Sequence, residues 1–217
     1  MLDLVYRPLL FLHVLAGTLA LVASVIAFGS SKWSKVHRYA GLIFFWSMLF
    51  TAVSSIPPAI TSGKWVLLLI AVFSFHLTYS GGRYIQFRRG EKQHKGDYLI
   101  SGIAVVFGLM LWGFGIPVFY RSMGILGALA PFMFGLLSIR MAQEDFKWYR
   151  GTDNSPKLAL RRHIGRMGGA AISAFTAFFV NVNFVVPGGL AWILPTALGS
   201  FLIAYYVRKV RLNRPIR

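Results

Sequence analysis

Residues 8–28 read PLLFLHVLAGTLALVASVIAF, a run of about twenty residues without Asp, Glu, Lys or Arg. A helix rises about 1.5 Å per residue, so a run of this length spans bilayer hydrocarbon about 30 Å thick. The run is too long, and too weakly basic at its start, for a cleaved signal peptide. It therefore predicts a transmembrane helix near the start of the chain.

Six further apolar runs follow, and turn residues separate them. The seven runs cover residues 8–28, 39–61, 65–86, 98–120, 122–142, 164–186 and 189–208. At the joint 121–122, one long hairpin is the alternative to two helices that meet at a short turn. No stretch between the runs has the character of a soluble domain. We expect an all-α polytopic membrane bundle of seven transmembrane helices, with residues 1–217 as a single domain.

The basic residues lie almost entirely on one side of the predicted spans. Twenty of the 23 lysines and arginines fall in the loops after the first, third and fifth runs or in the C-terminal tail. Only Arg7, Lys64 and Arg121 lie on the other side. The positive-inside rule then places the N-terminus outside and the C-terminus in the cytoplasm.

Composition excludes several classes of protein. The chain is 56% hydrophobic and only 13% charged, with a net charge of +17. Its positive face fits anionic lipid headgroups at the cytoplasmic surface, and no nucleic-acid partner is expected because no recognition module lies between the runs. Cysteine is absent, which excludes disulfides, thiolate metal sites and iron–sulfur clusters.

Two histidines lie within apolar runs, where an ionisable side chain is costly and suggests a functional site. His13 is in the outer half of the first run, beside a stripe of small residues, and His76 is near the middle of the third. By helical rise, His13 lies near the level of Ser54, Ser55 and Asn181. We expect these five side chains to line an outer ligand cavity. The alternative is that they only hydrogen-bond one another and hold helices together.

A second polar group gathers at the cytoplasmic boundary. His37 opens the second run, and His163 and Arg166, about one turn apart, open the sixth. We expect Arg166 to line a ligand cavity; the alternative is that basic side chains at an interface only orient helices. The fifth histidine, His94, lies in a polar loop, and we expect it to be solvated.

Three short motifs occur in order along most of the chain: LHVLAG at 12–17, HRYAG at 37–41 and HIGRM at 163–167. Together they resemble the Leu-His-x-x-Ala-Gly, His-Arg-x-x-Gly and His-x-x-Arg-Met motifs of a bacterial family of predicted multi-pass membrane proteins of unknown function. The chain departs from that family at Phe44, where the family often has tyrosine, and His76 is not part of the pattern. The resemblance implies a bacterial plasma (inner) membrane location and three histidines of interest. It implies no activity.

The first functional hypothesis is electron transfer by b-type haem in a histidine-lined bundle. Haem iron can take axial histidines from facing helices. His13 with His76 would bracket an outer haem, and His37 with His163 an inner one. The outer pair differs in depth by about 8 Å on the helical-rise estimate, which weakens it. No metal is expected beyond haem iron.

Other hypotheses stay open, including whether the protein is an enzyme at all. One is a small-solute or proton-linked transporter with His13 or His76 as its switch, although no inverted repeat supports it. Another is a non-catalytic accessory subunit whose polar features are all structural. A zinc hydrolase is disfavoured, because the histidines lie at three depths and no carboxylate lies within a run. A homo-oligomer and a membrane-complex partner are both compatible with the sequence.

Overall fold

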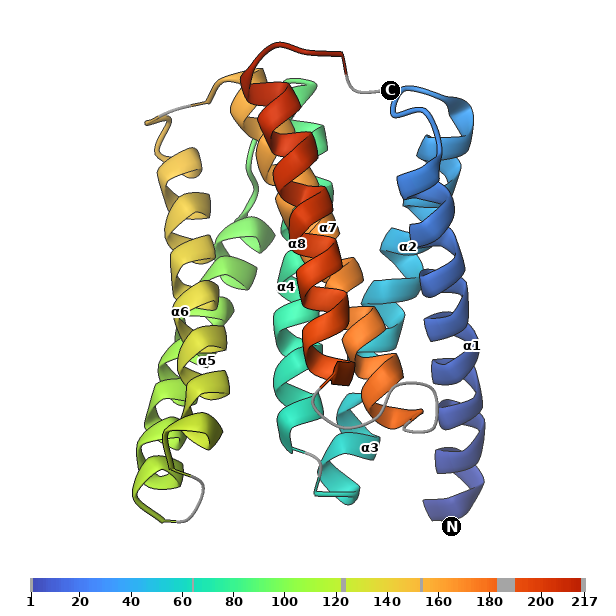
Figure 1. Cartoon of the computed structure of the whole chain (residues 1–217), viewed down its shortest axis with the longest axis vertical. Helices are drawn as coiled ribbons and strands as arrows, with labels where there is room; N and C mark the ends of the chain where they lie inside the picture. The colour runs from blue at the N-terminus through green and yellow to red at the C-terminus, as the bar shows by residue number, and fades with distance from the viewer. Residues whose placement is uncertain (1, 64, 122–123, 153, 183–189, 216–217) are drawn as a thin grey trace. The chain divides into compact units, whose positions relative to one another are not determined.

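The structure is a computed structural model that describes residues 2–63, 65–121, 124–152, 154–182 and 190–215, and these residues form helices and no strand (Figure 1). The helices are α1 (Leu2–Gly29), α2 (Lys35–Ser54), α3 (Ile56–Thr61), α4 (Trp65–Arg88), α5 (Lys95–Arg121), α6 (Gly124–Tyr149), α7 (Pro156–Asn181) and α8 (Leu190–Arg211). The all-α prediction is confirmed. Residues 122, 183–186 and 189, where predicted runs begin or end, lie outside the described residues.

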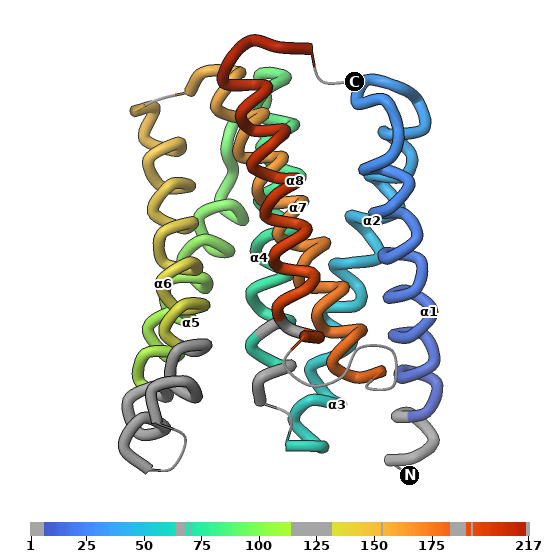
Figure 2. The backbone as a smooth tube through the Cα atoms, viewed as in Figure 1, coloured from blue at the N-terminus to red at the C-terminus, as the bar shows by residue number. Residues whose placement is uncertain are grey.

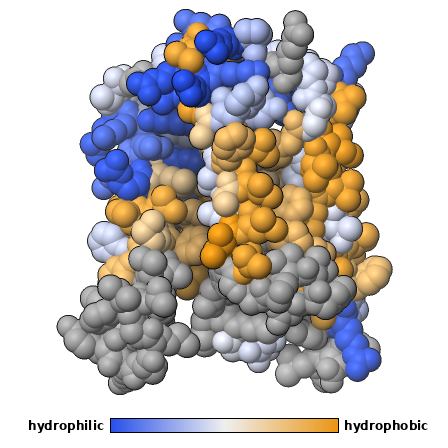
Figure 3. All heavy atoms as spheres, viewed as in Figure 1, coloured by the Kyte–Doolittle hydropathy of each residue, from blue (hydrophilic) through white to orange (hydrophobic). Residues whose placement is uncertain are grey.

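Three helical stretches of the described chain are long and apolar enough to cross a membrane: Arg7–Gly29, Lys35–Thr61 and Lys95–Gly113. Their apolar side chains face outward, with Phe11 69% and Leu99 64% exposed. Continuous apolar surface of this kind is unfavourable in water and favourable in lipid. In Figure 3, hydrophobic residues cover the sides of α1 and α8, and hydrophilic residues gather where α8 ends. The chain is a membrane protein.

The second predicted run, 39–61, differs from expectation because it is divided between α2 and α3. The break lies at Ser55, two residues before Pro57 and Pro58. Neither proline has an N–H to donate to a carbonyl one turn earlier, so the regular ladder cannot continue through them. The Ser55 backbone N–H still bonds Thr51 O at 3.1 Å, and α3 restarts with proline in its first turn, where proline is tolerated.

Most other boundaries lie within about five residues of the predicted runs, but α1 begins six residues earlier than predicted, α6 ends seven residues later and α7 begins eight residues earlier. This helix begins at Pro156, about two turns before the apolar run 164–186, so its first turns are helical but polar. Proline is favoured at the first position of a helix, which explains the early start. The joint at 121–122 separates two helices, because α5 ends at Arg121 and α6 begins at Gly124.

The helices divide into two compact units, one of α1–α4 with α7 and α8, the other of α5 and α6. In the first unit, α1, α2, α4 and α7 pack pairwise in a closed ring, and α8 packs on α7. The long helices of this unit alternate in direction, so the loop between α1 and α2, the end of α4, the start of α7 and the end of α8 share one end of this unit (Figure 2). Whether the two units act as a single domain remains a prediction.

Close packing in each unit depends on glycines. In the first, a Cβ atom on Gly199 of α8 would lie 2.3 Å from Cγ1 of Ile172 on α7, and one on Gly168 would lie 2.5 Å from Cγ1 of Ile203. In the second, Gly108 and Gly135 face each other, and a Cβ on either would lie 2.8 Å from the carbonyl oxygen of the other. Small residues of this kind allow membrane helices to approach closely.

We predict that Gly199→Ala destabilises the protein by about 1–2 kcal/mol, because the clash with Ile172 outweighs the gain in helix propensity. Gly165→Ala is the matched control, since a Cβ at Gly165 meets no atom within 4 Å. That variant should be neutral or slightly stabilising. Thermal unfolding of the two variants in the same detergent measures the difference, and equal stabilities would contradict this account of the contact between α7 and α8.

Candidate functional site

A cavity of about 500 Å³ lies at the shared end of the first unit. Residues of α1, α2, α4 and α7 line it, together with the loop after α1 and Tyr206 of α8. It lies between α2 and α7, the two diagonal members of the ring, each of which packs against both α1 and α4. This end of the unit is where the cytoplasmic-boundary group was predicted.

His37 and His163 both line this cavity, one from α2 and the other from α7. Nδ1 of His37 lies 2.9 Å from Ala27 O, and Nδ1 of His163 lies 2.8 Å from Gly81 O. A carbonyl oxygen can only accept, so each Nδ1 carries the hydrogen and donates it. In the neutral ring, Nε2 then holds a free lone pair. Histidines that bind metals are typically fixed in this way.

The loop after α1 positions His37. Ser34 is the N-cap of α2, and its side chain accepts the backbone N–H of His37 at 3.1 Å. The Nζ atom of Lys32 donates to three carbonyls, Ala27 at 2.9 Å, Phe28 at 2.6 Å and Ser30 at 3.3 Å. Ala27 O thus accepts hydrogen bonds from both Nζ of Lys32 and Nδ1 of His37. The end of α1 and the start of α2 are joined at this point.

The walls of the cavity are largely apolar, with Phe28, Phe44 and Met167 among them. Gly41 lies one turn after His37 and also lines the cavity. A Cβ built on Gly41 meets no atom within 4 Å, so the absence of a side chain leaves open space beside His37. The cavity can therefore admit a bulky apolar body next to two imidazoles.

Four basic residues line the cavity at its rim: Lys32, Lys35, Arg38 and Arg89. They are not equivalent. Lys32 is half-buried, it donates to the carbonyls of Ala27, Phe28 and Ser30, and its Nζ lies 4.8 Å from the ring centre of Tyr206. Burial lowers the pKa of Lys32. Within the described residues, the side chains of Lys35, Arg38 and Arg89 make no hydrogen bond or ion pair, and all three are exposed.

The predicted outer group is only partly brought together. Nδ1 of His13 lies 3.0 Å from Oγ of the buried Ser54. Ser55 donates instead to Ala52 O at 2.8 Å, and Asn181 to Ala177 O at 2.8 Å, so each bonds a carbonyl three or four residues earlier in the chain. His76 is buried on α4. The outer cavity and the pairing of His13 with His76 stay predictions.

Arg166 faces α4 and is not among the residues that line the inner cavity. Its side chain is 2% exposed, donates to Oγ of Ser80 at 3.1 Å and lies over the ring of Tyr84 at 5.8 Å. His94 belongs to the second unit, where its exposed ring lies 3.7 Å from the buried carboxylate of Asp97. In the described chain, no group of three or more His, Asp or Glu side chains is placed to hold a metal ion.

Sequence reasoning identified both histidines of the inner cavity but not what holds them. Ser34, three residues before His37, is a recognisable N-cap signal at the start of a helix. The two carbonyl acceptors carry no such signal, because any residue type provides one. The difference between Lys32 and the other rim cations is also invisible without the structure.

Comparison with protein-family models, with curated proteins and with solved structures found no match to this chain.

We predict that Lys32→Met destabilises the protein by about 1 kcal/mol, a fall in Tm of about 3 °C, because the last carbonyls of α1 lose their cationic cap. Lys35→Met removes the same charge three residues later, at the start of α2, but its side chain makes no contact of this kind. It should leave Tm nearly unchanged. Equal effects of the two substitutions would show that Lys32 contributes only through general charge.

Proposed function

We propose that this protein is an integral membrane protein that binds b-type haem between His37 and His163 and transfers electrons. The observation that carries the proposal is the pair of histidines in one cavity, each with Nδ1 donated to a backbone carbonyl. That arrangement leaves the Nε2 atom of each histidine with a lone pair that can bind a metal ion. A pair of imidazoles without a third protein ligand suits the two axial positions of haem iron better than a tetrahedral zinc site.

The shape of the site supports the same ligand. Cofactor pockets commonly measure about 300–1,000 Å³ and are lined mainly by apolar and aromatic side chains, as this one is. The two histidines come from diagonal helices of a four-helix ring, a common setting for cofactor sites. The open space at Gly41 lies on the same face of α2 as His37, where a flat macrocycle needs room.

Bound haem would supply reversible one-electron transfer. The chain supplies the rest. The carbonyls of Ala27 and Gly81 fix the orientation of the imidazoles and increase their basicity as ligands. The apolar walls limit access of water and lower the local polarity, which tunes the reduction potential.

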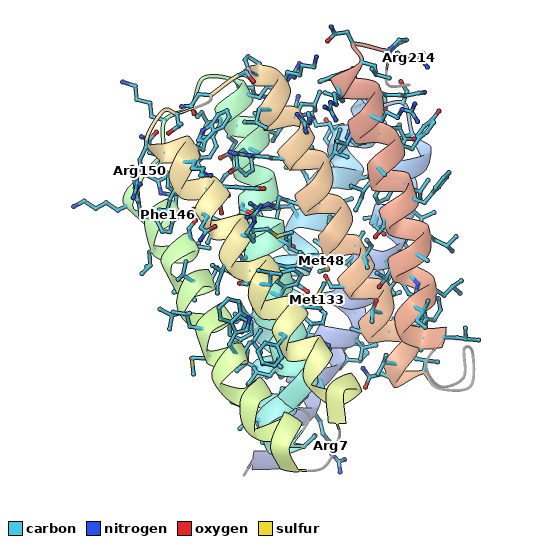
Figure 4. The ribbon with its side chains drawn as sticks, turned by 60° about the vertical axis from the view of Figure 1, so that its left-hand side comes forward. Arg7, Met48, Met133, Phe146, Arg150 and Arg214 are labelled. Atoms are coloured by element: carbon cyan, nitrogen blue, oxygen red, sulfur yellow. The ribbon has the colours of Figure 1, made fainter. Side chains whose placement is uncertain are left out.

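We further propose seven spans in a bacterial plasma membrane, with the N-terminus outside and the C-terminus in the cytoplasm. Three helical stretches of sufficient length and apolarity support this, as does the meeting of basic segments at one end of the first unit. Figure 4 shows Arg7 at the opposite end of that unit from Arg214. Anionic lipid headgroups are the proposed contacts of the basic end.

We predict that the purified protein, supplemented with haem, shows a Soret band typical of two-histidine ligation. His37→Ala and His163→Ala should each abolish that spectrum and weaken haem binding by more than about tenfold, because either removes an axial ligand. His94→Ala is the control, since its ring lies outside the cavity. His13→Ala reports separately on the outer pair, because it reduces the haem per chain only if that pair holds a second haem.

A steric pair of variants tests the cavity itself. Gly41→Leu fills the space beside His37 and should prevent haem binding, whereas Gly165→Leu places the same side chain in open space outside the cavity. A folded wild-type protein that stays colourless after haem supplementation would refute the proposal. It would leave transport or an accessory role as the remaining hypotheses.

The absence of cysteine provides a direct test of topology. Ser62→Cys lies after α3 and Ser31→Cys lies between α1 and α2, and both positions are exposed. In intact cells, an impermeant maleimide should label Ser62→Cys but reach Ser31→Cys only after the membrane is opened. The reverse pattern would invert the proposed orientation.

A further inference from the structure

The rim of the inner cavity carries positive charge that the first unit does not neutralise. Lys35 and Arg38 lie in the first turn of α2 and Arg89 lies directly after α4, and all three line the cavity. Among residues 1–89 and 156–217, Asp3 is the only acidic residue. It lies near the start of α1, about 36 Å along the helix from Ala27. Within the described residues of this unit, the cavity mouth therefore has no aspartate or glutamate partner.

We propose that Arg38 and Arg89 bind the two carboxylates of the haem that the cavity holds, with Lys35 adding to the field. This inference rests on the proposed function. It assigns the ligand as an amphipathic dianion whose apolar body lies between His37 and His163 and whose acidic edge faces the end of the first unit at which α8 ends.

The choice of Arg38 and Arg89 follows from their chemistry. A guanidinium offers paired N–H groups that match a carboxylate in a bidentate geometry. Within the described chain, neither side chain has these donors engaged. Lys32 is excluded as a direct partner because the carbonyls of Ala27, Phe28 and Ser30 take its three hydrogens. Lys32 contributes to the positive electrostatic potential at the cavity mouth without binding the ligand.

Position also separates the two arginines from the general basic surface. Arg38 directly follows His37 in the chain, and Arg89 adjoins α4, which provides the carbonyl that holds His163. Arg38 is thus linked to His37, and Arg89 to the helix that holds His163. A dianion bound by both would fix the rotation of the macrocycle about the axis through the two histidines. The acidic edge would then lie at the mouth, where a redox partner at that surface can approach it.

The test compares haem with haem dimethyl ester, in which the two carboxylates are neutral. The purified full-length protein is titrated with each in uncharged detergent, and the Soret band reports binding. We expect the wild type to bind haem about tenfold more tightly than the ester, since two partly exposed ion pairs contribute modestly. Arg38→Gln and Arg89→Gln should each reduce that preference by about threefold, and the double variant should abolish it.

Arg211→Gln is the matched control, because it removes one positive charge from the end of α8 without touching the cavity lining. It should leave the preference unchanged. A second arm adds phosphatidylglycerol to the micelles. If the rim instead binds lipid phosphate, that lipid removes the preference in the wild type, and the inference is overturned.

The outcomes separate the two proposals. If neither porphyrin binds, both the haem function and this inference fail. If both porphyrins bind with two-histidine spectra and equal affinity, the function stands and the carboxylate site is wrong. An equal loss of preference in Arg211→Gln would likewise overturn it, because the effect would then be one of net charge. Because each variant is scored by a ratio of two ligands, a general loss of folded protein cancels.

Discussion

The carbonyl oxygen of Ala27 is the acceptor on which the inner site depends. The last carbonyls of a helix have no partner within it, and inside or beside a membrane they must find one. Here Ala27 O takes Nδ1 of His37 and Nζ of Lys32. One backbone atom in the last turn of α1 thus fixes the short connection to α2 and sets which nitrogen of His37 keeps a free lone pair.

The same requirement acts at His163 in a different way. Gly81 O belongs to the interior of α4, so its acceptance of Nδ1 adds a bond from α7 to an existing helix. A Cβ on Gly81 would lie 3.0 Å from Cβ of Arg166 and 2.9 Å from Sδ of Met167, so the glycine helps α7 to approach α4 closely at this bond. The two histidines are thus held by carbonyls of α1 and α4, the helices that separate α2 from α7 in the ring. That leaves the space between α2 and α7 for a ligand.

Much of the helical architecture could be predicted from the sequence, because membrane hydrocarbon imposes a length and an apolar composition on each span. The break at Ser55 could be anticipated from Pro57 and Pro58, whereas hydropathy alone misses the early start of α7, since residues 156–163 carry no apolar run and only Pro156 marks the helix start. At the site, the sequence indicated His37 and His163 as a pair but ranked them no higher than His13 and His76. Residue types alone do not show which histidine meets a backbone carbonyl and which meets Ser54. That distinction comes from helix packing.

The positive charge of the chain bears on two separate questions, the orientation in the membrane and the charge at the cavity mouth. The sequence alone does not distinguish the residues concerned with each. Counted by loop, the basic residues indicate how the chain is inserted, and for most of them no further role is required. The cavity singles out a few of these cations. Lys32 has its hydrogens engaged by carbonyls at and just after the end of α1, whereas Arg38 and Arg89 line a cavity that also holds two imidazoles and apolar walls. Like charges gathered around a low-polarity cavity repel one another, and a bound anion relieves that repulsion more effectively there than on an open surface, where water and salt screen it. The proposed orientation and the proposed ligand preference therefore rest on the same residues, and the walls of the cavity decide which of them serve both.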